Sequence, residues 1–165
     1  MDKIRVLIVD DHTLFRETLQ NFLESDGRIQ VVGDAGDGIE AICKVGQLKP
    51  DIVLMDIAMP NLNGMQATRQ IKKEYPSTKV IMLTMYDTEQ YIAEMLRTGA
   101  SGYILKKASS QELISAIQAV YRSDAYLFPS ISKEALDEYL EQVKAGEENN
   151  QRLTPRELEL TGLIA

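Results

Sequence analysis

Five polar residues in this sequence follow short hydrophobic runs, and their side chains together could bind a cation and stabilise an anion. Asp10 and Asp11 close the first of these runs, Asp56 the third, Thr84 the fourth and Lys106 the fifth. In an open sheet of parallel strands, the carboxyl ends of the strands lie along one edge, and ligands bind there. The sequence therefore predicts that these five residues meet at one edge of a sheet.

The three acidic residues of this set indicate a metal site. Carboxylates that lie close together repel one another unless a cation neutralises them, and oxygen ligands suit Mg²⁺. Lys106 adds a positive charge, and the hydroxyl of Thr84 adds a hydrogen-bond donor. A carboxylate nucleophile with such partners makes a phosphoryl-transfer site, where catalysis consists mainly of positioning and charge stabilisation.

Each of these residues alone has an ordinary structural explanation. Asp is a good N-cap, so Asp10 could simply begin the helix that follows its strand. Turn chemistry does not require a Thr and a Lys at the remaining strand ends, however. The five residues taken jointly favour a functional site over a set of helix caps.

A second motif competes for the same sequence. Residues 36–41, Gly-Asp-Gly-Ile-Glu-Ala, follow a predicted strand, open a predicted helix and precede Asp56 at the spacing of a dinucleotide-binding fingerprint. Against this hypothesis, Asp37 would place a carboxylate beside the pyrophosphate. The hypothesis also leaves Asp10, Thr84 and Lys106 unexplained.

His12 is the only histidine of the chain and directly follows the paired Asp residues. It could be a further metal ligand there. A lone histidine in a loop is more often solvated, which is the interpretation that we favour from the sequence.

The residues that must position this site alternate between strand and helix patterns. Strands are predicted at 4–9, 29–32, 52–55, 79–83 and 102–105, all short apolar runs. The first helix is predicted to begin at Thr13, which could cap it, and to end before Gly27. Four more helices are predicted at 38–48, 64–75, 89–97 and 111–122. This alternation predicts right-handed crossovers and a parallel sheet covered on both faces.

Composition limits the class of protein. The chain has 165 residues, 18 Lys and Arg against 25 Asp and Glu, and 44% hydrophobic residues, which is enough for a core. It shows no apolar run long enough for a membrane span and no signal-peptide pattern, and Cys43 is its single cysteine. We therefore expect a cytoplasmic protein without membrane association. The net charge of −7 argues against unaided binding of nucleic acid.

The pattern changes after residue 124. Residues 125–152 read as an amphipathic helix followed by a polar, flexible linker. Residues 153–165 begin with Thr154 and Pro155, followed by Glu157, a helix start with capping-box spacing. A new domain is expected to begin here and to be cut short.

Residues 4 to about 124 resemble the receiver domain of bacterial two-component response regulators. The resemblance is carried by VDDH at 9–12, MDIAMPNLNG at 55–64, LT at 83–84 and GYILK at 102–106. It implies an α/β, flavodoxin-like doubly wound fold, with a five-stranded parallel sheet of order 2-1-3-4-5. The tail LTPRELELTGLIA resembles the opening of a LuxR-type helix-turn-helix domain, which implies a NarL/LuxR-class regulator. The implied domains are a receiver over 1–124, a helical linker over 125–152 and the start of the DNA-binding domain over 153–165.

The resemblance also assigns roles to residues. Asp56 would accept a phosphoryl group from a sensor histidine kinase, and Asp10, Asp11, Asp56 and the carbonyl of Ala58 would hold Mg²⁺. Further along the chain, Lys106 would contact the phosphoryl group, with Thr84 and Tyr103 as switch residues. Phosphorylation would promote a homodimer, and DNA would be bound only through the effector domain. Specific DNA binding by this chain alone is not expected, since it holds at most the first turns of one helix.

Two details of the sequence refine this interpretation. A rival class, the haloacid-dehalogenase-like phosphohydrolases, also uses an aspartyl nucleophile but places a second Asp two residues later, where this chain has Ala58. Ala58 and Tyr86 occupy positions that face the path of the hydrolytic water in receivers. Since Ala58 cannot hold a water and Tyr86 is bulky, the sequence predicts slow self-dephosphorylation, with plain packing as the alternative for both residues.

Overall fold

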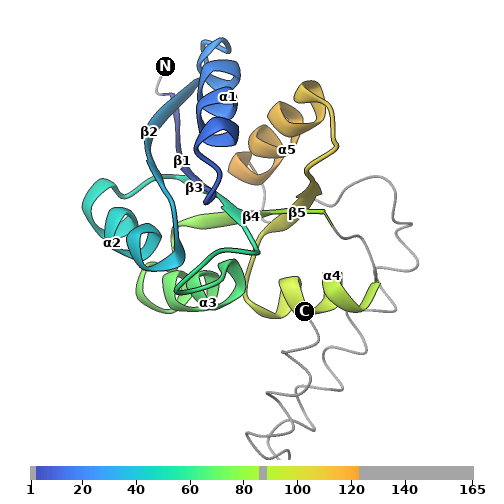
Figure 1. Ribbon diagram of the computed structural model, residues 1–165. Helices are drawn as coiled ribbons and strands as arrows, with labels where there is room; N and C mark the ends of the chain where they lie inside the picture. Colours follow the sequence, from blue (N-terminus) through green and yellow to red (C-terminus); the bar gives the residue numbers. More distant parts are fainter. Residues whose placement is uncertain (1–2, 86–88, 123–165) are drawn as a thin grey trace, which may run out of the picture.

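The structure is a computed structural model that describes residues 3–85 and 89–122. A five-stranded, all-parallel sheet lies between two layers of helices (Figure 1). The strands are β1 Ile4–Val9, β2 Ile29–Ala35, β3 Ile52–Asp56, β4 Lys79–Thr84 and β5 Gly102–Leu105. The helices are α1 Thr13–Glu24, α2 Gly38–Leu48, α3 Gly64–Glu74, α4 Glu89–Arg97 and α5 Ser110–Arg122. The strand order is β2-β1-β3-β4-β5, which confirms the predicted doubly wound fold.

The central strands are apolar because both of their faces are covered. All residues of β3 and β5 are buried, and only the first or second residue of β4 and β1 is partly exposed. Strands that alternate with helices in the chain pair in parallel, and the helices that connect them then pack on the faces of the sheet. The continuous hydrophobic runs of the sequence follow directly from this arrangement.

Two hydrophobic clusters fill the spaces between the sheet and the helix layers. Helices α1 and α5 lie on one face of the sheet, and α2, α3 and α4 lie on the other (Figure 1). The first cluster contains Leu23 of α1 and Ile117 of α5, both fully buried. The second contains Val45 of α2, Ile71 of α3 and Met95 of α4. Each helix therefore has one apolar stripe directed at the sheet, as its helical spacing predicted.

Of the points that differ from the sequence prediction, two lie near the site. Strand β2 continues to Ala35, since β1 keeps pairing with it through Gly33 after a shift of register between Val6 and Leu7. The N-cap of α1 is His12, whose side chain makes no capping hydrogen bond, so the prediction that Thr13 caps this helix is wrong. The extended backbone of His12 already accepts the first helical bond, from the amide of Arg16.

The predicted linker over 125–152 and the predicted domain start over 153–165 lie outside the described residues. In the described part of the chain, no helix is long and apolar enough to cross a membrane.

The register of the strands brings their carboxyl ends level with one another. Met55 of β3 pairs with Val9 of β1, and the next residue, Asp56, pairs with Leu83 of β4. Thr84 in turn pairs with Leu105 of β5. The polar residues that follow these pairs therefore emerge along one edge of the sheet.

Candidate functional site

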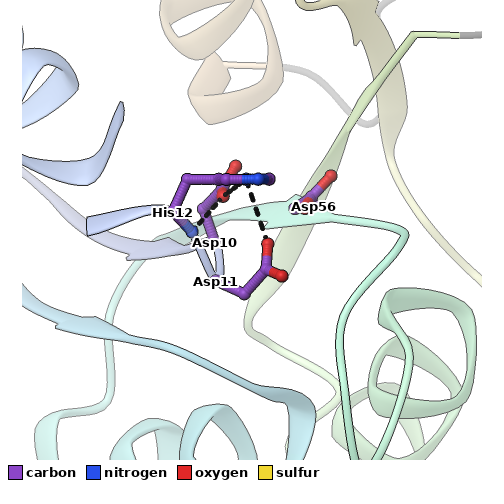
Figure 2. A group of neighbouring side chains, drawn as sticks. All are labelled: Asp10, Asp11, His12 and Asp56. Atoms are coloured by element: carbon purple, nitrogen blue, oxygen red, sulfur yellow. Dashed lines mark hydrogen bonds and ion pairs between the residues drawn. The ribbon is translucent and has the colours of Figure 1, made fainter. Parts of the chain in front are cut away.

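A cluster of three carboxylates and one imidazole lies at this edge. Asp10, Asp11, His12 and Asp56 each offer a ligand atom, and these atoms all lie within 4.8 Å of one another. Figure 2 shows the side chains of Asp11 and His12 beside Asp10, with Asp56 facing them from the end of β3. Asp10 and Asp56 are buried, whereas Asp11 and His12 are exposed. The predicted acidic cluster thus forms, and it has an open side.

Lys106 joins two of these carboxylates. Its Nζ donates to Asp10 Oδ2 at 2.9 Å and lies 3.1 Å from Asp56 Oδ1. The same nitrogen lies 4.8 Å from the centre of the Phe15 ring of α1, a cation–π distance. The structure therefore brings Lys106 into the cluster, as predicted, and holds its charge between the two buried acids.

The electrostatics of the cluster show a deficit of positive charge. Burial and the neighbouring charge of Asp10 raise the pKa of Asp56, and the contacts with Lys106 only partly oppose this. Burial alone would lower the pKa of Lys106, but its hydrogen bond to Asp10 and the charge of Asp56 outweigh burial and raise it. The protonated lysine therefore balances the negative charge of one carboxylate, and the charges of the other two carboxylates are left without a cation from Lys106.

The backbone around Asp56 is shaped by close packing. The amide of Ile57 donates to Asp56 Oδ1 at 2.9 Å, and the amide of Gly64 donates to the Ile57 carbonyl at 2.8 Å. A Cβ at position 64 would lie 2.0 Å from the Asp56 carbonyl oxygen, closer than any real contact. Gly64 is therefore required for α3 to begin against the end of β3, which explains why the segment 55–64 ends in glycine.

Asp10 is held by a residue that the sequence analysis did not identify. Arg16, in α1, donates from Nη1 to the Asp10 carbonyl oxygen and from Nε to Asp34 Oδ2 at 3.0 Å. The side chain of Arg16 is only 16% exposed. A cation about one turn into the helix that follows an Asp pair was the available signal. Without the fold, nothing in the sequence placed Asp34 beside it.

The remaining predicted site residues differ in where they lie. Thr84 is buried at the end of β4, and its carbonyl accepts from the Lys106 amide at 2.8 Å. Tyr103 is fully buried in β5, within the cluster under α2, α3 and α4. Ala58 is exposed two residues after Asp56. Tyr86 lies outside the described residues, so the prediction made for it is not addressed by the structure.

The dinucleotide-like motif has a structural explanation. Asp37 is the N-cap of α2, and it accepts from the Glu40 amide at 2.8 Å and from Asn61 Nδ2 at 2.9 Å. A Cβ on Gly38 would lie 2.4 Å from the carbonyl oxygen of Leu62. The acidic cap and the packed loop occupy the space that a pyrophosphate would need, so the motif serves packing here.

The residues present fit a hard divalent cation. Asp10, Asp11 and Asp56 supply carboxylate oxygens within a few ångströms of one another. Such oxygens are the donors that Mg²⁺ prefers. Lys106 brings one positive charge to these three carboxylates, through its contacts with Asp10 and Asp56.

A doubly wound parallel sheet with three carboxylates and a lysine at its carboxyl edge defines the class of the receiver domains. The family model described as "Response regulator receiver domain" matches residues 6–118, and the chain belongs to this family. Receiver domains bind Mg²⁺ at an acidic pocket, which corresponds here to the Asp cluster.

Relatives place the chain among regulators of the DegU and NreC type. It is 39% identical over 158 residues to "Transcriptional regulatory protein DegU" of Brevibacillus brevis, covering 96% of this chain and 67% of that protein. It is 40% identical to "Oxygen regulatory protein NreC" of Staphylococcus carnosus, covering 98% of this chain and 77% of that protein. The chain is thus the receiver domain of a response regulator of two-component systems that control transcription, not a classical enzyme.

Solved structures agree with this assignment. A two-component response regulator of the LuxR family from Aurantimonas sp. SI85-9A1 matches with a TM-score of 0.74 and 30% identity, over 86% of this chain and 98% of that chain. The receiver domain of the putative response regulator NarL from Mycobacterium tuberculosis matches with a TM-score of 0.72 and 31% identity, over 74% and 99%. The NarL/LuxR class predicted from the sequence is confirmed.

Proposed function

We propose that this chain is activated by transfer of a phosphoryl group to Asp56 from a partner sensor histidine kinase. The observation that carries the proposal is the contact of Lys106 Nζ with both Asp10 and Asp56. It places a positive charge beside Asp56, the buried acidic residue at the end of β3.

The contacts of Asp56 distinguish its two oxygens. In the described part of the chain, Oδ1 accepts from the Ile57 amide and faces Lys106 Nζ, which leaves Oδ2 to attack phosphorus. Attack forms the Oδ2–P bond and breaks the P–N bond of the phosphohistidine. The released imidazole nitrogen keeps the electron pair of the P–N bond. The imidazole then exchanges any proton that it gains or loses with solvent. Lys106 neutralises charge that develops on the phosphoryl oxygens, and the Thr84 hydroxyl donates to one of them.

Magnesium would be held by this chain's own oxygens. Carboxylates of Asp10, Asp11 and Asp56 and the carbonyl of Ala58 are the ligands that the resemblance assigns. When bound, the ion would neutralise negative charge on the phosphoryl oxygens. In this scheme, Arg16 fixes the backbone of Asp10. The Asp10 carboxylate is then already placed beside those of Asp11 and Asp56 before the ion binds.

The output of the domain follows from its place in the family. Engagement of Thr84 by the phosphoryl group and repositioning of Tyr103 would shift an equilibrium towards an active surface around α4, β5 and α5. That surface would favour a homodimer, and DNA would be bound through the effector domain rather than through residues 3–122. The relatives carry the names of transcriptional and oxygen regulatory proteins. We accordingly propose a cytoplasmic transcription regulator for the whole protein.

The intact mass of the protein after incubation with acetyl phosphate and Mg²⁺ tests this proposal. We expect a gain of one phosphoryl group in the wild type and none in Asp56→Asn. Asp11→Ala and chelation by EDTA should also prevent labelling, because the clustered carboxylates need a cation. Asp26→Asn is the matched control, since Asp26 lies just before β2 at the opposite end of the strands.

Two results would contradict the proposal. Equal labelling of Asp56→Asn would place the phosphoryl group elsewhere. Continuous release of phosphate from a small phosphomonoester, without accumulation of labelled protein, would instead support a phosphohydrolase of the haloacid-dehalogenase type.

A further inference from the structure

His12 lies against the carboxylate cluster although it is exposed to solvent. Its backbone amide donates to Asp10 Oδ1 at 2.8 Å. Its ring nitrogen Nδ1 lies 3.0 Å from the same oxygen and 3.1 Å from Asp11 Oδ1 (Figure 2). The side chain is 70% exposed, so the sequence-based interpretation of a solvated histidine describes only part of its surroundings.

The imidazole of His12 does not cap α1. Although His12 is the N-cap residue, its side chain makes no capping hydrogen bond. Its backbone is extended, with φ −92° and ψ 105°, and its ring lies against Asp10 and Asp11. The ring is therefore held by contacts with Asp10 and Asp11, which are the same groups that would hold a cation.

The geometry points to a mixed site, and we propose that His12 Nδ1 joins Asp10, Asp11 and Asp56 in binding a borderline transition-metal dication such as Zn²⁺. The inference rests on the proposed function, since it concerns the same cation site. Four ligand atoms within 4.8 Å of one another have to close on a shared ion by only about 1 Å, because Zn–N and Zn–O bonds are about 2.0–2.2 Å long. The exposed ring leaves an entry path open for the ion.

The added nitrogen changes the preference of the site among metals. Carboxylate and carbonyl oxygens alone suit Mg²⁺, whereas imidazole nitrogen suits Zn²⁺ and its first-row neighbours. With His12 as a ligand, the site would bind Zn²⁺ through three carboxylates and one imidazole. Mg²⁺ would use the oxygens alone, so loss of the imidazole should affect the two ions differently.

Calorimetric titration with Zn²⁺ and with Mg²⁺ tests the proposal. The background carries Cys43→Ser, because Cys43 is an exposed thiol that would bind Zn²⁺ by itself. In His12→Phe, which keeps a ring of similar size without nitrogen, the dissociation constant for Zn²⁺ should rise by about tenfold or more. The dissociation constant for Mg²⁺ should change by less than about twofold, since magnesium prefers the retained oxygens.

The single histidine gives a direct readout of coordination. In protein labelled with ¹⁵N-histidine, only His12 contributes imidazole signals. Saturation with Zn²⁺ should shift the Nδ1 resonance as a metal-bound nitrogen, and saturation with Mg²⁺ should not. As a control, a histidine placed at exposed position 24 by Glu24→His in the His12→Phe variant should not restore the affinity for Zn²⁺.

Two outcomes would overturn the inference. One is an Nδ1 resonance that stays unchanged on saturation with Zn²⁺. The other is equal affinity for Zn²⁺ in wild type and His12→Phe, which would mean that the ring only forms a hydrogen bond with the acids. Neither outcome would affect labelling of Asp56 with Mg²⁺. Failure of that labelling in the wild type would contradict the proposed function instead.

Discussion

Lys106 Nζ lies 2.9 Å from Asp10 Oδ2, a contact between residues 96 positions apart. Lys106 follows β5 and Asp10 follows β1, and these strands are separated in the sheet by β3 and β4. The lysine therefore reaches across the carboxyl edge of the sheet and meets Asp56 on its way, at 3.1 Å. One side chain thus compensates two buried acids and links the two ends of the receiver sequence.

Replacing Lys106 by methionine should destabilise the protein most when no divalent cation is present. Removal of one partner leaves Asp10 and Asp56 buried without compensation, which we expect to cost about 2 kcal/mol. Mg²⁺ should recover much of this loss and should bind more tightly than in the wild type, because it no longer competes with the ammonium group. Urea unfolding of Lys106→Met in EDTA and in Mg²⁺ measures both effects.

Lys107→Met is the control for this prediction. Lys107 has the same charge and lies next in the chain, but it is exposed. If both variants lost the same stability, or if Mg²⁺ made no difference to Lys106→Met, the compensating role of Lys106 would be wrong.

Arg16 should act as a positioning residue for the metal site. Its guanidinium binds the Asp10 carbonyl and the Asp34 carboxylate, so Arg16→Ala releases the backbone that orients Asp10. We expect the affinity for Mg²⁺ to fall by about tenfold, which is the usual effect of removing a group that orients a ligand. Calorimetry with Mg²⁺ measures the affinity, and circular dichroism checks that the fold is retained.

Arg28→Ala provides the comparison. Arg28 also forms an ion pair, with Asp26 at 2.9 Å, but this pair lies ahead of β2 at the far end of the strands. An unchanged affinity for Mg²⁺ in Arg16→Ala would show that Asp10 holds its position without the arginine.

Glu94 should make the stability of the fold depend on pH. It is 6% exposed in α4, and among the described residues neither of its carboxylate oxygens accepts a hydrogen bond. Burial raises the pKa of Glu94 above its ordinary 4.5, and the charges of Arg69 and Arg97 only partly oppose this. The folded protein therefore holds the proton more tightly than the unfolded chain does. The contribution of Glu94 is fully present below about pH 4.5 and is lost as the pH rises through the folded-state pKa.

Glu94→Gln stays neutral and should therefore be more stable than the wild type at neutral pH, with a difference that disappears in acid. Melting temperatures measured between pH 4 and pH 8 test this. Glu17→Gln removes an acid from the exposed side of α1 and should leave the pH profile unchanged. A wild-type melting temperature above that of Glu94→Gln at neutral pH would mean that the attraction to the two arginines outweighs burial.

The sequence predicted the strands and the meeting of Asp10, Asp56 and Lys106 because hydrophobic runs closed by polar residues are local signals of parallel strands. It did not predict the role of Arg16, because that role depends on Asp34, which reaches the site only when β2 pairs with β1. For the same reason β2 was predicted too short. Gly33 and Asp34, near its end, lack strand propensity and are kept in the strand by pairing with β1.

The position of His12 shows the same limit at the site itself. A single histidine in a loop is solvated by default, and only the structure shows that its ring lies against Asp10 and Asp11. Residue type and spacing therefore predicted which oxygens gather, but the preferred interpretation of a solvated His12 did not predict its contacts with Asp10 and Asp11.

Ala58 should set how long the phosphoryl group lasts on Asp56. It is exposed two residues after the acceptor, and its methyl group cannot hydrogen-bond a water. Hydrolysis of an acyl phosphate needs a water aligned with the phosphorus, and a side-chain amide at position 58 could hold one there. Ala58→Asn should therefore speed the loss of phosphate by about tenfold, a barrier change of about 1.4 kcal/mol.

Decay of the phosphorylated protein after removal of the donor measures this effect. Ala58→Leu is the matched control, because leucine has nearly the shape of asparagine but forms no hydrogen bond. It should decay no faster than the wild type, since it only adds bulk near the path of the water. Faster decay in Ala58→Leu as well would assign the effect to a disturbed loop after β3. Equal decay in all three proteins would mean that position 58 does not control the water, and that Ala58 is small only for packing.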